Sequence, residues 1–218
     1  MYEFSSGPHV LAAARPFRLL FAILILAAGF AGAPARAATP AEQYVTDNVQ
    51  KGITILDDKS LTKDERRTQF QSFVIGLLDI KIIAEYTLGQ YRRGASPGDL
   101  AAFDEAFKNY GLAVYQTYFN KFSGQTLQVT GSYVLSPDES IVKTIMIDPN
   151  DKKGTKPLEV DFRVAKEGNR EVVVDFAVEG VWLREVEKSD FTSFLSQHGG
   201  DISALIAMLK KKTEQNSK

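Results

Sequence analysis

The sequence predicts an α+β domain in which helices pack a four-stranded antiparallel sheet around an apolar cavity. Three observations predict it. Apolar residues recur every three or four positions between residues 41 and 119, as in amphipathic helices. After Gly124 the period becomes two, as in strands. After Gly180 the helical period returns. Consecutive strands between helical segments are typical of an antiparallel meander with helices on it.

Four segments in the first half favour helices. Residues 41–56 carry one apolar face, and Thr62 with Glu65 forms the pattern of a capping box. A short helix over residues 80–88 would end at Gly89. The longest helix opens at Ser96, because a Ser followed by Pro is a strong helix start.

Four segments in the second half favour strands: residues 127–133, 141–147, 158–165 and 171–181. Two helices on either side of a Gly-Gly break end the chain.

The N-terminus has the layout of a secretory signal peptide. Arg15 and Arg18 precede an apolar run over residues 19–30, and an Ala-Arg-Ala site ends at Ala37. We expect residues 1–37 to be a cleaved signal peptide and residues 38–218 to be a single domain. A retained membrane anchor is the alternative, but the apolar run of about 12 residues is shorter than the ~20 that span a bilayer.

Composition excludes several classes of function. The chain has no Cys, so it has no disulfide, thiol nucleophile or cysteine metal site. Without residues 1–37 the formal net charge of the chain is about −3. A nucleic-acid binder is expected to carry an excess of basic residues, so this charge argues against that function.

The sequence also argues against an enzyme. His198 is the only histidine after residue 37, and beside a Gly-Gly break it is better explained as a residue at a helix end than as a base. Asp175 and Glu179 would lie roughly 13 Å apart along one strand at ~3.3 Å per residue, too far for a paired acid and base. No carboxylate spacing suggests a metal site.

Four features of the sequence stand in a characteristic order: Ile80 to Gly89, the basic pair that follows it, Leu158 to Val164, and the stretch from Val172 to Leu209 with its Glu179-Gly180 step. This ordered set resembles the MlaC and toluene-tolerance auxiliary family of periplasmic phospholipid carriers. Together the four features cover about residues 40 to 212. The resemblance implies a lipid carrier rather than an enzyme, with bound lipid as cargo and no cofactor.

The resemblance implies that some of the many apolar residues of the chain line a lipid site. For any single residue, a place in an ordinary hydrophobic core is an equally good explanation. The candidates are apolar residues that share predicted helix or strand faces: Phe73, Leu77, Phe103, Phe107, Tyr110, Val114, Val160, Phe162, Val164, Val174 and Phe176. Arg92 and Arg93 are the candidates for a lipid phosphate, and a solvated loop pair is the alternative.

The energetics of cargo burial imply partners. Burying about 25 to 30 methylenes at ~0.8 kcal/mol each gives ~20 kcal/mol, so a lipid would not leave into water at a useful rate. The resemblance implies a monomer that shuttles phospholipid through the periplasm, between an inner-membrane ABC-type complex and an outer-membrane lipoprotein, and so maintains outer-membrane lipid asymmetry. A hopanoid carrier, suggested by one branch of the family, and a scaffold module with a filled core stay open.

Overall fold

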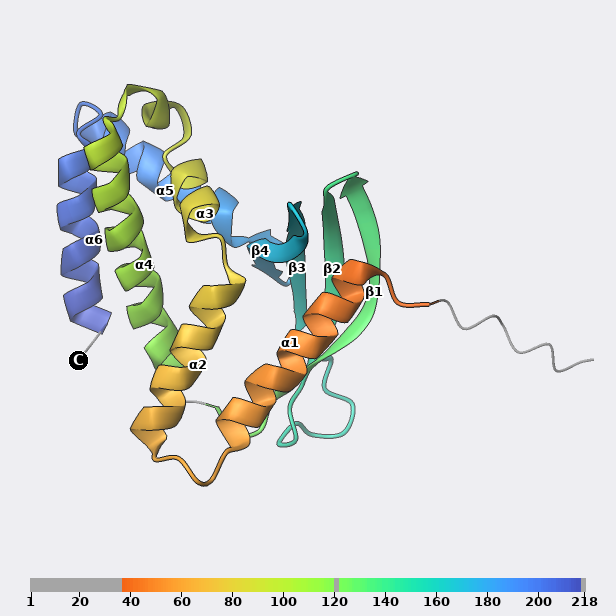
Figure 1. Cartoon of the computed structure of the whole chain (residues 1–218). Helices are drawn as coiled ribbons and strands as arrows, with labels where there is room; N and C mark the ends of the chain where they lie inside the picture. Colours follow the sequence, from red (N-terminus) through yellow and green to blue (C-terminus); the bar gives the residue numbers. More distant parts are fainter. Residues whose placement is uncertain (1–36, 120–121, 217–218) are drawn as a thin grey trace, which may run out of the picture. The chain divides into compact units, whose positions relative to one another are not determined.

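The computed structural model describes residues 37–119 and 122–216 (Figure 1). Residues Ala38–Lys218 form one compact unit. The expected signal peptide lies outside the described residues and stays a prediction. Among the described residues, no helix is long and apolar enough to cross a membrane.

The helices of the first half begin where the sequence predicts them. Helices α1 (Pro40–Asp57) and α2 (Lys63–Leu77) each open with a capping box, formed by Thr39 and Glu42 in α1 and by Thr62 and Glu65 in α2. The short α3 (Ile80–Thr87) leads into the 3-10 helix η1 (Gly89–Gly94). The long α4 (Pro97–Phe119) follows, and the hydroxyl of Ser96 accepts a hydrogen bond from the N–H of Asp99 (3.1 Å).

The sheet is an antiparallel meander, as predicted, with strand order β1 to β5. Its strands are β1 (Thr126–Ser136), β2 (Glu139–Ile147), β3 (Glu159–Glu167), β4 (Arg170–Val178) and β5 (Val181–Trp182).

The expectation of four strands is therefore wrong by one. Glu179 and Gly180 have φ of 49° and 79°, and this pair of positive values makes a tight hairpin that turns the chain back onto β4. The predicted strand over residues 171–181 runs through this turn and therefore misses the reversal.

Two hydrophobic cores hold the unit together. The larger joins α3 and α4 to the last two helices, α5 (Leu183–Gln197) and α6 (Ile202–Asn216), around Phe103 and Phe191. The smaller lies where α1 crosses the sheet, and Ala41 and Val45 pack there on Val142 and Val164. Figure 1 shows α4 and α6 side by side and α1 lying across the sheet. The cavity described next lies beside the smaller core.

Candidate functional site

An apolar cavity of about 420 Å³ lies between α1, α2 and the concave face of the sheet. Its wall exposes almost only carbon. The residues that line it are Tyr44, Val45, Asn48, Val49, Gly52, Ile53 and Leu56 from α1; Phe70, Phe73, Val74 and Leu77 from α2; Leu78, Phe122 and Gln125 from connecting segments; and Thr126, Leu127, Met146, Val160, Phe162, Val173 and Phe176 from the sheet.

Local sequence explains how α1 and α2 frame the cavity. A Cβ at Gly52 would lie 3.1 Å from the ring of Phe70 and 3.3 Å from the ring of Phe73, closer than nearly all real Cβ contacts. The missing side chain thus lets two aromatic rings of α2 approach the α1 backbone. The rings close one side of the cavity instead of being pushed away from it.

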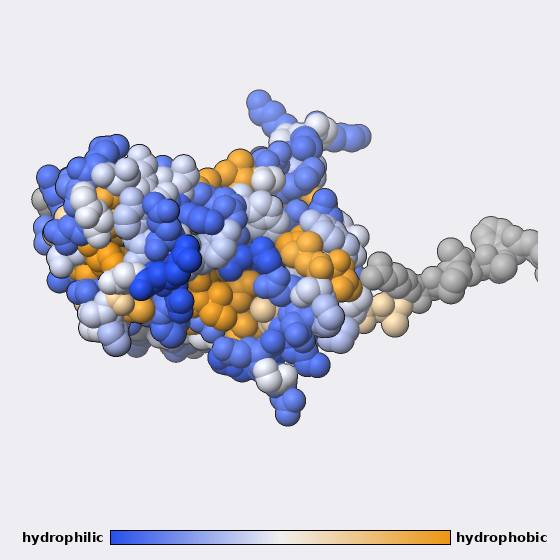
Figure 2. All heavy atoms as spheres, turned by 90° about the horizontal axis from the view of Figure 1, so that it is seen from above, coloured by the Kyte–Doolittle hydropathy of each residue, from blue (hydrophilic) through white to orange (hydrophobic). Residues whose placement is uncertain are grey.

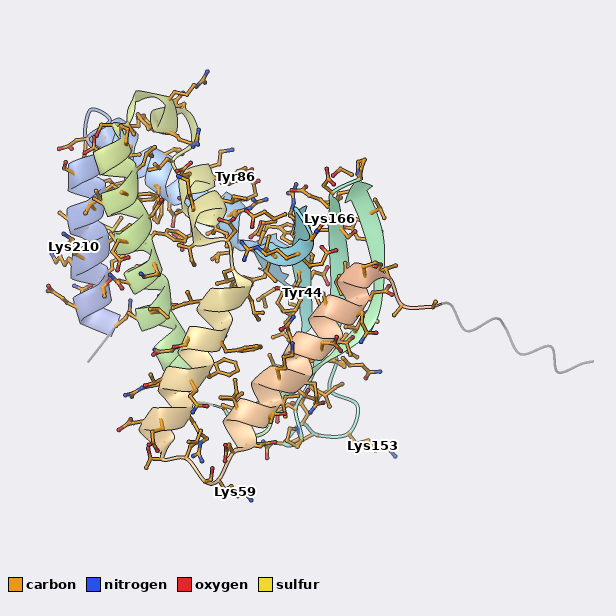
Figure 3. The ribbon with its side chains drawn as sticks, viewed as in Figure 1. Tyr44, Lys59, Tyr86, Lys153, Lys166 and Lys210 are labelled. Atoms are coloured by element: carbon orange, nitrogen blue, oxygen red, sulfur yellow. The ribbon has the colours of Figure 1, made fainter. Side chains whose placement is uncertain are left out.

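The few polar groups in the wall are engaged by the protein itself. Tyr44 Oη donates to the carbonyl oxygen of Leu77 at 3.5 Å, and burial raises the pKa of this hydroxyl. Asn48 Nδ2 donates to the carbonyl oxygen of Tyr44 at 2.8 Å, and Gln125 Nε2 donates to Asp148 Oδ2 at 2.7 Å. Figure 3 shows Tyr44 between α1 and the end of α2. The interior therefore suits an acyl chain and offers little to a charged headgroup.

Five of the predicted lipid-binding residues are brought together in this cavity. They are Phe73, Leu77, Val160, Phe162 and Phe176. Those on strands share one face, as the alternation of side chains predicted. Their contact with lipid remains a prediction.

Three predicted residues of α4 lie elsewhere, in the helical core or packed against it. Phe103 and Phe107 are buried, and each meets the ring of Phe191 edge-on at 6.1 and 6.2 Å between centroids. Tyr110 packs against the same core. The period of the sequence correctly predicts an apolar face on α4. This face packs against α5 and α6 and does not border the cavity. Val114, further along α4, is half-buried and is absent from the described cavity wall.

Val164 and Val174 also lie outside the cavity wall. Val164 shares the face of Val160 but lies under α1, in the smaller core. In β4 the register with β3 passes from Asp175 to Val173, so Val174 is the extra residue of a β-bulge. The bulge turns Val173 toward the cavity in place of Val174, which strict alternation could not predict.

The candidate headgroup residues lie in η1, and neither lines the cavity among the described residues. Arg92 pairs with Glu85, with Nη2 at 2.5 Å and Nε at 2.6 Å from the same carboxylate oxygen. Arg93 is exposed. The geometry therefore favours a structural role for Arg92, which pins η1 to α3.

Sequence reasoning missed the contribution of α1, which supplies more of the wall than any other single helix or strand. The apolar face of residues 41–56 was recognised as a helix face, but nothing in its period distinguishes cavity lining from core. Phe70 and Phe122 were missed for the same reason. Gly52, a glycine within a helix face, was the one local signal of close helix approach.

No group of three or more His, Cys, Asp or Glu in the described part of the chain could hold a metal ion. His198 stacks on the ring of Phe194 with its Nδ1 at 2.8 Å from the carbonyl oxygen of Phe194, at the end of α5.

A helix-and-sheet fold with an apolar cavity between its layers defines a class of small ligand-holding domains, and comparison with known proteins places the chain within it. The family model described as "MlaC protein" matches residues 46–211, so the chain belongs to the MlaC family. Its fold is similar to that of a phospholipid-binding protein from Ralstonia solanacearum, solved in complex with a phospholipid. The two are 22% identical, with a TM-score of 0.71 over 83% of this chain and 100% of that one.

Proposed function

We propose that this protein is a lipid-binding carrier that holds acyl chains in the cavity between α1, α2 and the sheet. The observation that carries the proposal is the cavity itself, about 420 Å³ with a wall of carbon. Membership of the MlaC family and a fold shared with a phospholipid-binding protein support it.

The size of the cavity sets the scale of binding. At about 30 Å³ per methylene, close to the volume of a water molecule, 420 Å³ accommodates ~14 methylenes. Their burial at ~0.8 kcal/mol each contributes ~11 kcal/mol before the costs of ordering. Since the polar groups of the wall are engaged, the headgroup of the lipid stays outside.

Strong apolar binding makes release the difficult step, and this motivates the rest of the proposal. A signal peptide directs the protein to the periplasm and is cleaved after Ala37. There it exchanges phospholipid between an inner-membrane ABC-type complex and an outer-membrane lipoprotein, and thereby maintains outer-membrane lipid asymmetry. Docking onto such partners opens the cavity, so cargo never passes through water.

The test is native mass spectrometry of the protein purified from periplasm, with lipid extraction of the same sample. We expect a stoichiometric adduct with the mass of a phospholipid. Val160→Phe, which places a larger side chain in the cavity, should weaken lipid binding about tenfold in the dissociation constant, equivalent to ~1.4 kcal/mol. Val181→Phe, on the adjacent hairpin at a residue 60% exposed, is the matched control and should leave it unchanged.

Each other outcome overturns part of the proposal. A hopanoid adduct would replace phospholipid as the cargo. A bare protein that also takes no lipid from liposomes would exclude a carrier and leave a scaffold module. Equal loading of the two variants would move the lipid site away from this cavity.

A further inference from the structure

We infer that α2 is the movable wall of the cavity, and that a two-chain lipid enters by displacing α2 toward a groove on its other side. This inference rests on the proposed lipid-carrying function. It concerns how the cavity acquires the volume that its cargo needs.

The first observation is that α2 is a helix without a buried residue. None of its fifteen residues is buried, whereas the eight residues of α3 include four that are. Its apolar side chains, Phe70, Phe73, Val74 and Leu77, line the cavity instead of entering a core. Little burial therefore opposes the displacement of α2, because local opening is easiest where few apolar contacts hold a segment.

A second hollow lies on the other side of α2. An open groove of about 600 Å³ is bordered by Gln71 of α2, by Ala102, Glu105, Ala106, Asn109, Leu112 and Ala113 of α4, and by Lys210, Thr213 and Glu214 of α6. Of α2, only Gln71 borders this groove, whereas the apolar side chains of the helix line the cavity. Figure 1 shows α2 between α1 and the lower part of α4.

Both ends of α2 are tethered, so it moves as a wall rather than detaching. At its start, Arg66 Nη1 donates to the carbonyl oxygens of Asp58 (3.0 Å) and Leu61 (3.2 Å). Just beyond its end, the N–H of Asp79 donates to the carbonyl oxygen of Val173 in β4 (3.1 Å). The weak contact of Tyr44 Oη with Leu77, at 3.5 Å, is the hydrogen bond that an outward movement breaks first.

The other walls are held more firmly. α1 buries Ala41 and Val45 against the sheet, and the strands are paired across the whole meander. α4, which borders the groove and not the cavity, is anchored by Phe103, which is fully buried. We therefore expect the cavity to expand by movement of α2.

Volume gives the reason to expect the movement. A space for ~14 methylenes at about 30 Å³ each holds roughly one acyl chain. A lipid with two chains of ordinary length requires about twice that space, whereas a lysophospholipid with one chain fits the cavity as it stands.

A wedge in the groove tests this inference. Ala102→Trp fills the groove from an exposed position on α4, and Ala101→Trp places the same side chain at an exposed neighbour that does not line it. We expect A102W to bind diacyl phospholipid from liposomes about tenfold more weakly than A101W, and lysophosphatidylcholine equally well. Equal binding of the diacyl lipid by the two variants overturns the inference.

A distance measurement tests the movement directly. The chain has no native cysteine, so spin labels on Ser72→Cys in α2 and Lys211→Cys in α6 report one distance. We expect this distance to shorten when diacyl lipid binds, and to stay constant with the lysolipid. A control pair, Asp99→Cys and Lys211→Cys, spans α4 and α6 and should not change. An unchanged distance from Ser72 with diacyl lipid bound contradicts the inference.

Failure of the inference and failure of the proposed function are distinguishable. If the unmodified protein binds neither lipid, the carrier function fails and the inference with it. If it binds both, while the wedge and the spin labels detect no role of α2, the carrier function stands and only the movable wall is rejected.

Discussion

The Nε atom of Arg184 lies 3.2 Å from Oδ2 of Asp175, and both side chains are buried. The other oxygen of Asp175 accepts hydrogen bonds from the N–H groups of Arg184 (3.1 Å) and Phe176 (2.9 Å). The pair joins β4 to the first turn of α5, immediately after the Glu179-Gly180 turn. It therefore connects the sheet, which carries the cavity, to the helical core.

Removing the charge of Asp175 should be costly. Burial raises the pKa of this carboxyl, while Arg184 and the backbone donors oppose the rise. Asp175→Asn leaves Arg184 buried without its counterion, so we expect a loss of about 3–5 kcal/mol in the free energy of unfolding. Urea denaturation measures it. Arg170→Gln, which breaks an exposed pair with Glu167, is the control and should leave the midpoint of the denaturation curve unchanged.

The contribution of Glu85 should depend on pH. Hydrogen bonds from Lys81 and Arg92 lower the pKa of the buried Glu85 carboxyl, against the effect of burial. Because the folded-state pKa lies below the unfolded value, this stabilisation is present above the unfolded pKa and is lost as the pH falls through the folded one.

Glu85→Gln should accordingly cost about 1 kcal/mol at pH 7, with an allowance for solvent screening of both exposed partners. The difference from the unmodified protein should shrink toward zero as the pH falls below about 4. Unfolding curves across this range measure it, with Glu214→Gln as an exposed control. A difference that grows on acidification would contradict this assignment.

Two helix caps of the same kind should respond differently to the same substitution, and the Thr39 hydroxyl additionally lies 3.2 Å from the Ser132 hydroxyl of β1. Thr39 opens α1, which packs on the sheet, and Thr62 opens α2, which buries no residue. Thr39→Ala should lower global stability by about 1 kcal/mol. Thr62→Ala should mainly speed amide hydrogen exchange within α2, with a smaller effect on global unfolding. Equal losses of global stability would mean that α2 is as firmly held as α1.

The turn at Gly180 should not tolerate a side chain. Gly180 has φ of 79°, and no atom lies within 4 Å of the Cβ that alanine would add. The cost of Gly180→Ala is then backbone strain alone, and we expect a loss of about 1 kcal/mol. Gly111→Ala, in the interior of α4 with equally open surroundings, should instead stabilise the protein by up to ~1 kcal/mol. Thermal unfolding compares the two.

Local chemistry made much of the fold predictable. The capping box at Thr62 and the Ser-Pro start at residue 96 specify helix starts through hydrogen bonds that form within four residues. The period of two through β3 places Val160 and Phe162 on one face without knowledge of the rest of the chain. The sequence by itself thus determined the α+β class, the order of the six helices and of β1 to β4, and the resemblance to the family.

Only the tertiary structure decided which apolar faces border the cavity. Phe103 and Phe73 lie on helix faces of the same character, yet the first is buried beneath α5 and the second lines the cavity. A β-bulge places Val173 instead of Val174 in the cavity wall, and a two-residue turn after β4 allows β5 to form. The hydrophobic effect is non-directional. The period of apolar residues therefore predicts that a helix or strand face is buried, but the packing of distant segments determines which segment, or which cavity, that face meets.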